Sequence, residues 1–199
     1  MFAGVPSNLK QEDTVMNDIK PIETIYNDYR FRSRLEARWA VFFDALGVIY
    51  RYETEGFDLG NGLYYLPDFY LPASNWWVEI KGVMNNTDLK KIDAFGEHHN
   101  IVVLGDIPAA TTEDTRAWVE RNYSGWESFR TPYDFPYLPC ICPKCGKFGF
   151  EFDGRGARIC GDTCCPDDDK GYTYDDPAIL RAYRIARQAR FEHGETPIF

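Results

Sequence analysis

Residues 63–81 decide the fold of this chain, and their sequence is LYYLPDFYLPASNWWVEIK. Two runs rich in aromatic and aliphatic residues, 63–71 and 76–80, are typical of β-strands, and the Pro-Ala-Ser-Asn between them is typical of a turn. The stretch therefore predicts a β-hairpin. Because alternate residues of a strand share a face, Glu79 and Lys81 would project together, with their neighbours turned into a core.

The hairpin would also bring Asp68, which follows Pro67, beside Glu79. Mg²⁺ prefers oxygen ligands and is usually held by one or two carboxylates together with waters and phosphate oxygens. Lys81 would position or deprotonate an attacking water, or neutralise charge on a phosphate, whereas an arginine would not give up its proton. These groups outline a site that hydrolyses phosphodiesters with a metal ion. The alternative is an acidic turn residue and a surface E-x-K ion pair worth under about 1 kcal/mol.

Over residues 29–105 the chain resembles the PD-(D/E)xK nuclease superfamily, which has the restriction-endonuclease-like fold. The most specific part of the resemblance is LPDF at residues 66–69 paired with VEIKG at residues 78–82. It implies a catalytic Mg²⁺ or Mn²⁺ ion. The metal ligands and the lysine that the resemblance implies are Asp68, Glu79, the peptide carbonyl of Ile80, and Lys81.

Many members of this superfamily also carry an acidic residue on the helix before the sheet, and here that residue would be Glu36. The sequence SRLE at residues 33–36 fits the S-x-x-E capping box of a helix N-terminus as well. The helix that follows is indicated by apolar residues at helical spacing and by Gly47 at its end. Glu36 would therefore cap this helix, reach the metal, or pair with Arg34 or Arg38.

The remaining elements indicate an α/β fold, a restriction-endonuclease-like mixed sheet flanked by helices. They are a strand at residues 48–53, a helix at 88–98, a buried strand at 101–105, and helices at about 113–121 and 177–191. Tyr64, Trp76 and Trp77 are expected mainly in the core rather than stacked on bases.

All six cysteines lie between Cys140 and Cys165. Cys142-Pro-Lys-Cys145-Gly has the C-P-x-C-G form of a zinc knuckle, whose tight turn aims two thiolates at one ion. Cys160 with either Cys164 or Cys165 would supply the second pair. That half departs from a regular C-x-x-C, so the choice between the last two thiols stays open, and Cys140 would be spare.

Between the cysteine pairs, alternating phenylalanines at residues 148–152, a turn at 153–156 and a return at 157–159 predict a small ribbon. The ribbon has little core of its own, so structural Zn²⁺ would have to stabilise it, by about 10–16 kcal/mol apparent. Disulfides in a secreted protein are the alternative. The N-terminus shows no signal peptide, which favours zinc and a cytoplasmic location, in the host if a phage or mobile element encodes the chain.

The predicted organisation is an extension at residues 1–25, a nuclease-like core at 26–135, the zinc ribbon at 136–175, and a helix and tail at 176–199. The net charge of −9 argues against indiscriminate coating of nucleic acid, and no apolar run is long enough to cross a membrane. Arginines do gather at residues 30–38 and 181–190, where they would bind phosphate or simply face solvent.

The function that the resemblance implies is metal-dependent hydrolysis of DNA by an endonuclease, structure-selective or nicking, with a homodimer as one way to cut both strands. The Gln-x-x-x-Tyr motif of RecB-like exonucleases is not found after Lys81, which favours an endonuclease. Two alternatives are a non-catalytic protein that binds nucleic acid or inhibits a partner on the same scaffold, and a zinc-dependent interaction module. An intact set of Asp68, Glu79 and Lys81 counts against the non-catalytic protein, because a pure binder has no need of these three groups.

Overall fold

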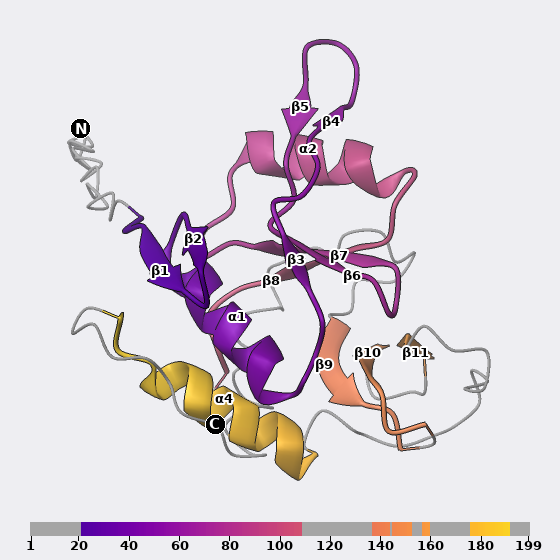
Figure 1. Cartoon of the computed structure of the whole chain (residues 1–199). Helices are drawn as coiled ribbons and strands as arrows, with labels where there is room; N and C mark the ends of the chain where they lie inside the picture. The colour runs from indigo at the N-terminus through magenta and orange to yellow at the C-terminus, as the bar shows by residue number, and fades with distance from the viewer. Residues whose placement is uncertain (1–20, 109–136, 144, 153–156, 160–175, 192–199) are drawn as a thin grey trace, which may run out of the picture.

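The structure is a computed structural model that describes residues 21–108, 137–143, 145–152, 157–159 and 176–191 (Figure 1). The described residues form a mixed α/β fold with three helices and several small sheets. The helix expected at residues 113–121 lies outside this part of the chain. Within the described residues, no helix has the length and apolar character needed to cross a bilayer.

The central sheet has four strands in the order β3-β6-β7-β8. They are β3 (Arg51–Tyr52), β6 (Phe69–Leu71), β7 (Trp76–Ile80) and β8 (Ile101–Leu104). The predicted hairpin is confirmed, because β6 and β7 are antiparallel and Leu71 pairs with Trp76 across the turn. β7 and β8 run parallel, and α2 (Asn86–Gly96) supplies the crossover that a parallel pair requires.

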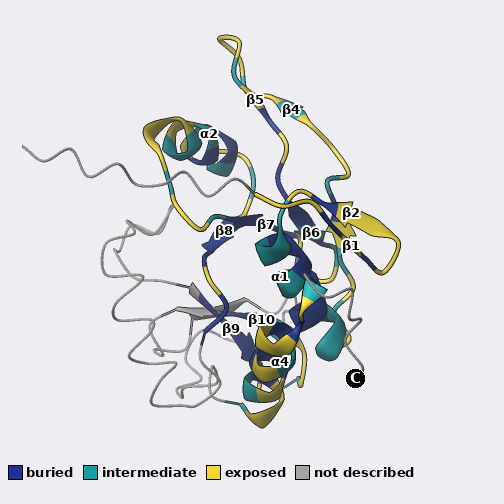
Figure 2. Cartoon of the chain, turned by 90° about the vertical axis from the view of Figure 1, so that its left-hand side faces the viewer, coloured by how far each residue is buried: buried dark blue, intermediate teal, exposed yellow. Residues whose placement is uncertain are grey.

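Helices cover both faces of this sheet (Figure 1). The first, α1 (Arg34–Ala45), packs its aromatic residues against one face, where the rings of Phe43 and Phe69 lie 5.5 Å apart between centroids. α2 covers the other face with Phe95. Since strand residues alternate, β7 supplies side chains to both layers, and all five of its residues are buried (Figure 2).

α1 begins and ends where the sequence predicts. Ser33 is its N-cap, and the Ser33 hydroxyl oxygen accepts a hydrogen bond from the Glu36 amide. Gly47 follows the C-cap Leu46 with φ +65°, a left-handed conformation that glycine adopts without strain. A hairpin of β1 (Thr24–Tyr26) and β2 (Tyr29–Phe31) leads into this helix, so the paired structure starts two residues before the core boundary expected at residue 26.

The expected strand at residues 63–71 is broken, which corrects the sequence prediction. β5 (Tyr64–Tyr65) pairs with β4 (Phe57–Asp58) in a separate hairpin, and only β6 joins the central sheet. Extending the β6–β7 register would pair Ile80 with Pro67. The Ile80 amide instead donates to a carboxylate oxygen of Asp68 at 2.7 Å, so the side chain of Asp68 ends the ladder.

Two further expectations need correction. The strand predicted at residues 48–53 is reduced to β3, because the Val48 amide bonds the end of α1 and Glu53 has φ +44°, outside the strand region. Tyr64, expected in the core, is 66% exposed, because the β4–β5 hairpin projects away from the central sheet (Figure 1). Trp76 and Trp77 are buried as predicted.

A second, three-stranded sheet packs against the first unit. Its strands are β9 (Tyr137–Ile141), β10 (Phe148–Phe152) and β11 (Ala157–Ile159), all antiparallel in the order β11-β10-β9. Its residues Phe148 and Phe150 pack into the main core, so the ribbon is stabilised by the first unit and not by a core of its own. Phe150 is fully buried, and its ring centroid lies 5.8 Å from that of Trp76 of β7. The ring centroids of Phe148 and Phe43 of α1 lie 5.9 Å apart.

The predicted C-terminal helix is confirmed as α4 (Pro177–Gln188), which packs beside α1. The ring of Tyr183 stacks on Phe42 with centroids 4.8 Å apart. At the end of the helix, Arg187 donates a hydrogen bond to the Ile107 carbonyl at 3.0 Å, so this arginine ties the helix to the main core.

Candidate active site

Asp68 is held at the break between β5 and β6. Its side chain is almost completely buried, and one oxygen, Oδ2, accepts the Ile80 amide at 2.7 Å. The other oxygen, Oδ1, accepts a guanidinium hydrogen of Arg32 at 2.7 Å. The peptide carbonyl of Asp68 accepts a hydrogen bond from the Glu53 amide at 2.9 Å. This bond joins the break between β5 and β6 to the end of β3. The carboxylate is therefore fixed between a backbone donor and a cation.

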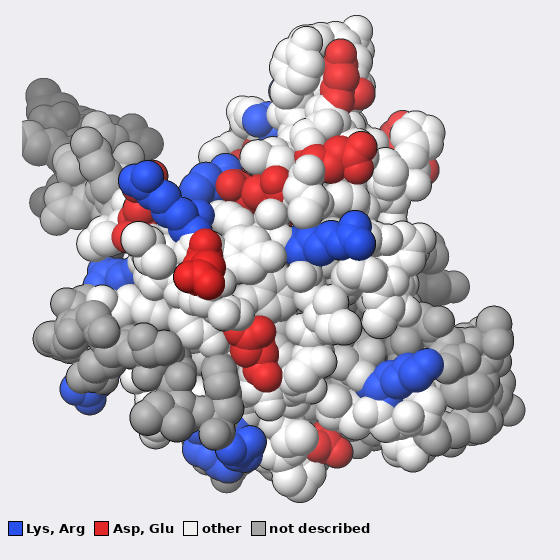
Figure 3. All heavy atoms as spheres, in the orientation of Figure 1, with Lys and Arg blue, Asp and Glu red and all other residues white. Residues whose placement is uncertain are grey.

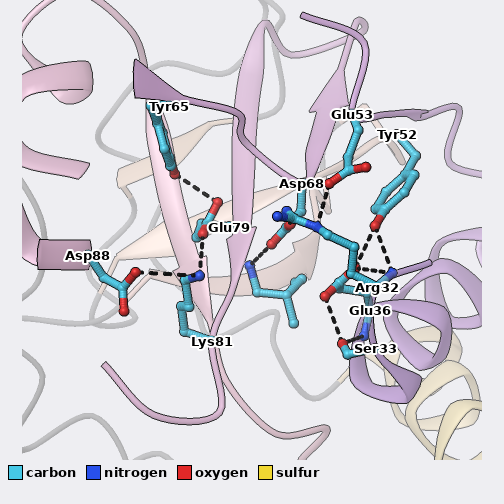
Figure 4. Close-up of polar contacts among 11 residues, drawn as sticks. Arg32, Ser33, Glu36, Tyr52, Glu53, Tyr65, Asp68, Glu79, Lys81 and Asp88 are labelled. Carbon is cyan, nitrogen blue, oxygen red and sulfur yellow. Dashed lines mark hydrogen bonds and ion pairs between the residues drawn. The ribbon is translucent and has the colours of Figure 1, made fainter. Parts of the chain in front are cut away.

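Glu79 is presented by the middle of the central sheet. The alternation of β7 turns Val78 and Ile80 toward the α1 layer and leaves Glu79 on the α2 side. The side chain is buried, with Oε2 accepting the hydroxyl of Tyr65 at 2.8 Å and Oε1 lying 3.0 Å from the ammonium of Lys81. Figure 4 shows Asp68, just before β6, near Glu79 of the neighbouring strand β7, with these donors around the two carboxylates.

Lys81 lies directly after β7, at the carboxyl end of the strand that runs parallel to β8. Its half-buried ammonium pairs with Glu79 at 3.0 Å and also approaches Asp88 of α2 at 3.6 Å. Because the Glu79 side chain is only 3% exposed, this is not the surface ion pair that the sequence left open. The sheet thus brings Asp68, Glu79 and Lys81 together, as the hairpin predicts.

The backbone of Ile80 faces the same edge as Asp68. In an antiparallel pair, the amide and carbonyl of one residue point to the same neighbour. Since the Ile80 amide donates to Asp68 while the Lys81 amide donates to Leu104 of β8, the Ile80 carbonyl also points toward the β6 side. This orientation is the one that a metal-ligating carbonyl would need.

Glu36 has its carboxylate engaged at the start of α1. Oε1 accepts the Ser33 hydroxyl at 2.7 Å, and Oε2 accepts the Tyr52 hydroxyl at 2.6 Å and the Arg32 amide at 3.0 Å. Among the roles that the sequence left open, these contacts support capping of the helix. The residue is buried close enough to the site for its charge to raise the pKa of Asp68.

Arg32 is the site residue that sequence reasoning missed. The sequence places it only among the arginines of residues 30–38. In the structure, its Nη2 lies 2.7 Å from Oδ1 of Asp68, and its Nε lies 2.5 Å from Oε1 of Glu53. The contact with Glu53 is an ion pair by distance and lacks hydrogen-bond geometry. Tyr65 was missed as well. The available signal was chemical: buried carboxylates require donors or cations. Tyr65 lies three residues before Asp68, whereas Arg32 is distant in sequence from both Asp68 and Glu79.

Electrostatics set Asp68 apart from an ordinary aspartate. Burial raises the pKa of the Asp68 carboxyl well above its usual value, and the negative charges of Glu79 and Glu36 raise this pKa further. The Ile80 amide and Arg32 lower the same pKa but do not cancel the effect of burial. A carboxylate in this position gains from any additional cation that reaches it.

The pKa values of Glu79 and Lys81 are linked, because the two side chains form an ion pair. Burial raises the pKa of Glu79 against the opposing effects of Lys81 and Tyr65. For Lys81, burial lowers the pKa, but the charges of Glu79, Asp88 and Asp68 outweigh burial and leave the pKa raised. Lys81 is therefore an ammonium ion at neutral pH in this state, suited to charge neutralisation and to holding a water molecule, and it would need to lose contact with Glu79 to act as a base.

The site opens to solvent through a pocket of about 500 Å³. Its walls come from the β4–β5 hairpin, the end of β7, and α2. The residues that line it are Arg32, Gly56, Phe57, Asp58, Tyr64, Tyr65, Leu66, Glu79, Lys81, Asp88 and Lys91. The face of the molecule in Figure 3 mixes acidic and basic side chains and has no single basic patch, in keeping with the net charge of −9.

The donor atoms fit a hard divalent cation in kind. Asp68 and Glu79 offer carboxylate oxygens, and the Ile80 carbonyl faces the same edge. Within the described ranges, no group of three or more His, Cys, Asp or Glu side chains is arranged to hold a metal ion. A metal here would therefore rest on two carboxylates, backbone oxygen, water and phosphate, which is the usual coordination of Mg²⁺.

The cysteine site is described only in part. Cys142 and Cys145 flank a tight turn in which the Gly146 amide donates to the Cys142 carbonyl at 2.8 Å, and Gly146 has φ +69°. This is the backbone turn that the knuckle sequence predicts. No two of the described cysteines form a disulfide with each other, and Cys140 is buried. The expected second pair, Cys160 with Cys164 or Cys165, lies outside the described residues.

Comparison with known proteins adds no further information: the chain matches no family model, no curated protein and no solved structure. A function must therefore be argued from the geometry of the site itself.

Proposed function

We propose that this protein is a metal-dependent nuclease with a restriction-endonuclease-like fold that hydrolyses phosphodiester bonds in DNA. One observation carries the proposal. Two buried carboxylates with raised pKa values, Asp68 and Glu79, lie close together, and Glu79 lines an open pocket beside an ammonium, Lys81. Burial of two carboxyl groups costs folding free energy even where donors surround them, so such a cluster is a recognised mark of a functional site.

Each residue has a distinct role in this proposal. Asp68, Glu79 and the Ile80 carbonyl would hold Mg²⁺ or Mn²⁺, which when bound lowers the pKa of a water ligand and polarises the phosphate. Lys81 would neutralise charge on the phosphate and orient the attacking water. Glu36 would act indirectly, because it fixes Tyr52 and the Arg32 backbone beside Asp68.

An endonuclease is favoured over an exonuclease acting processively on ends. The pocket lies between a projecting hairpin and α2 and is open to solvent, so a continuous strand could lie across it. The absence of the RecB-like Gln-x-x-x-Tyr from the sequence after Lys81 agrees with this choice. A homodimer would let two such sites cut both strands.

The knuckle turn supports a structural zinc site as a second part of the proposal. Cys142 and Cys145 would supply two thiolates, and Cys160 with Cys164 or Cys165 would supply the others. Zinc would then fix the ends of the β9–β11 sheet. Spectroscopic detection of zinc released by a thiol-specific reagent tests this part, and a fully unfolded protein that releases no zinc would exclude it.

Cleavage of DNA by the purified chain tests the nuclease proposal. Supercoiled plasmid, branched DNA and single strands are incubated with Mg²⁺, Mn²⁺ or a chelator. The wild type is expected to cut in the presence of metal only, and Lys81→Ala is expected to cut at least about 100-fold more slowly, because it loses a group that acts on the reacting atoms.

Lys90→Ala is the matched control, since Lys90 is an exposed lysine of the nearby helix α2 that does not line the pocket. It should retain wild-type activity. Equal behaviour of wild type and Lys81→Ala in every metal would end the enzyme proposal. DNA retention without cleavage would then favour the non-catalytic nucleic-acid-binding alternative.

A further inference from the structure

Every carboxylate oxygen of the two candidate ligands already has a donor from the protein. On Asp68, these donors are the Ile80 amide at 2.7 Å and Arg32 at 2.7 Å. On Glu79, they are the Tyr65 hydroxyl at 2.8 Å and Lys81 at 3.0 Å. A divalent cation that approaches Asp68 therefore meets a positively charged group in direct contact with the oxygen it would bind.

The donors differ in how easily they can leave. The Ile80 amide belongs to the backbone of the central strand, and its displacement would deform the sheet. Arg32 comes from the short segment between β2 and α1, and its side chain is 51% exposed. A guanidinium on a long side chain can turn toward solvent without moving any strand. Of the two groups that hold Asp68, only Arg32 can make room for a metal.

The other contacts of Arg32 define where it would go. Its Nε remains beside Glu53, and its side chain already lines the pocket that contains Glu79 and Lys81. A guanidinium presents several N–H donors in one plane and binds phosphate oxygens in pairs. Once released from Asp68, Arg32 would face the same space that the phosphate of the substrate must enter.

We propose that Arg32 is a displaceable counter-ion: it neutralises Asp68 in the metal-free protein, yields this position to the catalytic divalent cation, and then binds the substrate phosphate in the pocket. This inference rests on the proposed nuclease function and adds a coupling between metal binding and the position of Arg32. The coupling makes an unusual prediction. Removing the arginine strengthens metal binding although it weakens the enzyme.

Titration of Mn²⁺ into the DNA-free protein by calorimetry tests the competition directly. Arg32→Gln is expected to bind Mn²⁺ about tenfold more tightly than the wild type, because a charge-assisted contact with Asp68 no longer has to be broken. Arg32→Lys keeps the charge and should lie between the two. Arg30→Gln is the control. Arg30 pairs with Glu23 on the surface, so this substitution removes an equal charge nearby without touching Asp68.

Mn²⁺ affinity in Arg32→Gln that equals or falls below that of the wild type would overturn the proposal. If Arg32→Gln is unfolded without metal, recovery of the wild-type circular dichroism spectrum in Mn²⁺ supports the proposal, and failure to recover it at saturating Mn²⁺ overturns it. DNA cleavage supplies the second measurement: Arg32→Gln should show a KM for DNA raised about tenfold or more, and an unchanged KM would contradict the phosphate contact.

The result also separates this inference from the proposed function. A wild type that binds Mn²⁺ and cuts DNA, together with an Arg32→Gln variant of unchanged affinity, would refute only the counter-ion role. Absence of Mn²⁺ binding in the wild type and in every variant would refute both. Binding in Arg32→Gln but not in the wild type would support the competition in its strongest form.

Discussion

Asp68 shows at the scale of a single residue how stability and function oppose each other in this protein. Its carboxyl is buried beside Glu79, and burial is the main cause of its raised pKa. Ionisation of Asp68 therefore costs more free energy in the folded chain than in the unfolded chain, where the carboxylate is hydrated. An additional cation beside Asp68 would offset part of this cost.

The sign of the pH dependence follows from that raised pKa. The stability that Asp68 contributes is fully present below its unfolded pKa of about 3.9 and is lost as pH rises through the higher folded pKa. Asp68→Asn cannot ionise, so its melting temperature without metal should exceed that of the wild type at pH 8. We expect a gain of about 1 kcal/mol, or about 2–4 °C, which shrinks as pH falls toward 5.

Thermal unfolding between pH 5 and 8, with and without Mn²⁺, measures both sides of this balance. Mn²⁺ should raise the melting temperature of the wild type and not that of Asp68→Asn. Asp58→Asn is the control, because Asp58 is an exposed carboxylate that lines the same pocket. An Asp68→Asn variant less stable than the wild type at every pH would contradict the analysis.

At the scale of elements, the site depends on the places where regular structure stops. The 63–71 segment leaves the sheet at Pro67, which has no amide hydrogen, and the side chain of Asp68 takes over the Ile80 amide. β3 ends just before Glu53, and the Glu53 amide donates to the Asp68 carbonyl. α1 begins immediately after Arg32 and Ser33. Three element ends thus meet around one carboxylate.

Glu36→Gln tests whether the start of α1 acts on the metal or only on the fold. Gln keeps one oxygen acceptor for Ser33 or Tyr52, and its amide nitrogen can donate to the other hydroxyl. The variant should therefore bind Mn²⁺ within about twofold of the wild type if Glu36 is a cap. Glu36→Ala should lower the free energy of unfolding by about 1–2 kcal/mol, since it leaves the Tyr52 hydroxyl without this partner. A tenfold loss of Mn²⁺ affinity in Glu36→Gln would instead assign the residue to the metal.

At the scale of the whole molecule, the three-stranded sheet β11-β10-β9 and the central sheet share one core. Phe150 of β10 belongs to the same buried cluster as Phe42, Val78 and Tyr183, which come from α1, β7 and α4. Segments far apart in the sequence therefore stabilise one another. Loss of order in the β9–β10 pair would expose part of the surface that supports β7, the strand that carries Glu79.

Zinc removal should consequently affect the entire chain. If the knuckle binds zinc, Cys145→Ser is expected to release the metal and to lower the melting temperature of the whole protein in one transition, by about 5 °C or more, because structural zinc contributes folding energy. Differential scanning calorimetry with zinc analysis makes the measurement. Cys140→Ala is the control for zinc content, as Cys140 is the expected spare thiol. Two independent transitions, or an unchanged core transition after zinc loss, would contradict the shared core.

Local sequence signals correctly predicted the elements in which the local preference of the residues and the tertiary packing favour the same secondary structure. The β6–β7 hairpin, the ends of α1, helix α2 and the buried strand β8 follow from residue periodicity, turn residues and caps. The same signals overextended the strands at 48–53 and 63–71. Both errors arise where a side chain or a helix end takes an amide that a strand would use, and no local propensity records such competition.

The sequence by itself determined the chemical groups of the candidate site and their order on strands, because a period of two and a tight turn leave few ways to arrange Asp68, Glu79 and Lys81. Only the tertiary structure decided which groups hold them. Arg32 lies 36 positions before Asp68, and its contact depends on how the β1–β2 hairpin and α1 pack on the sheet. Burial and charge balance arise from such long-range packing, so the counter-ion of the site could not be read from the motif that contains its ligands.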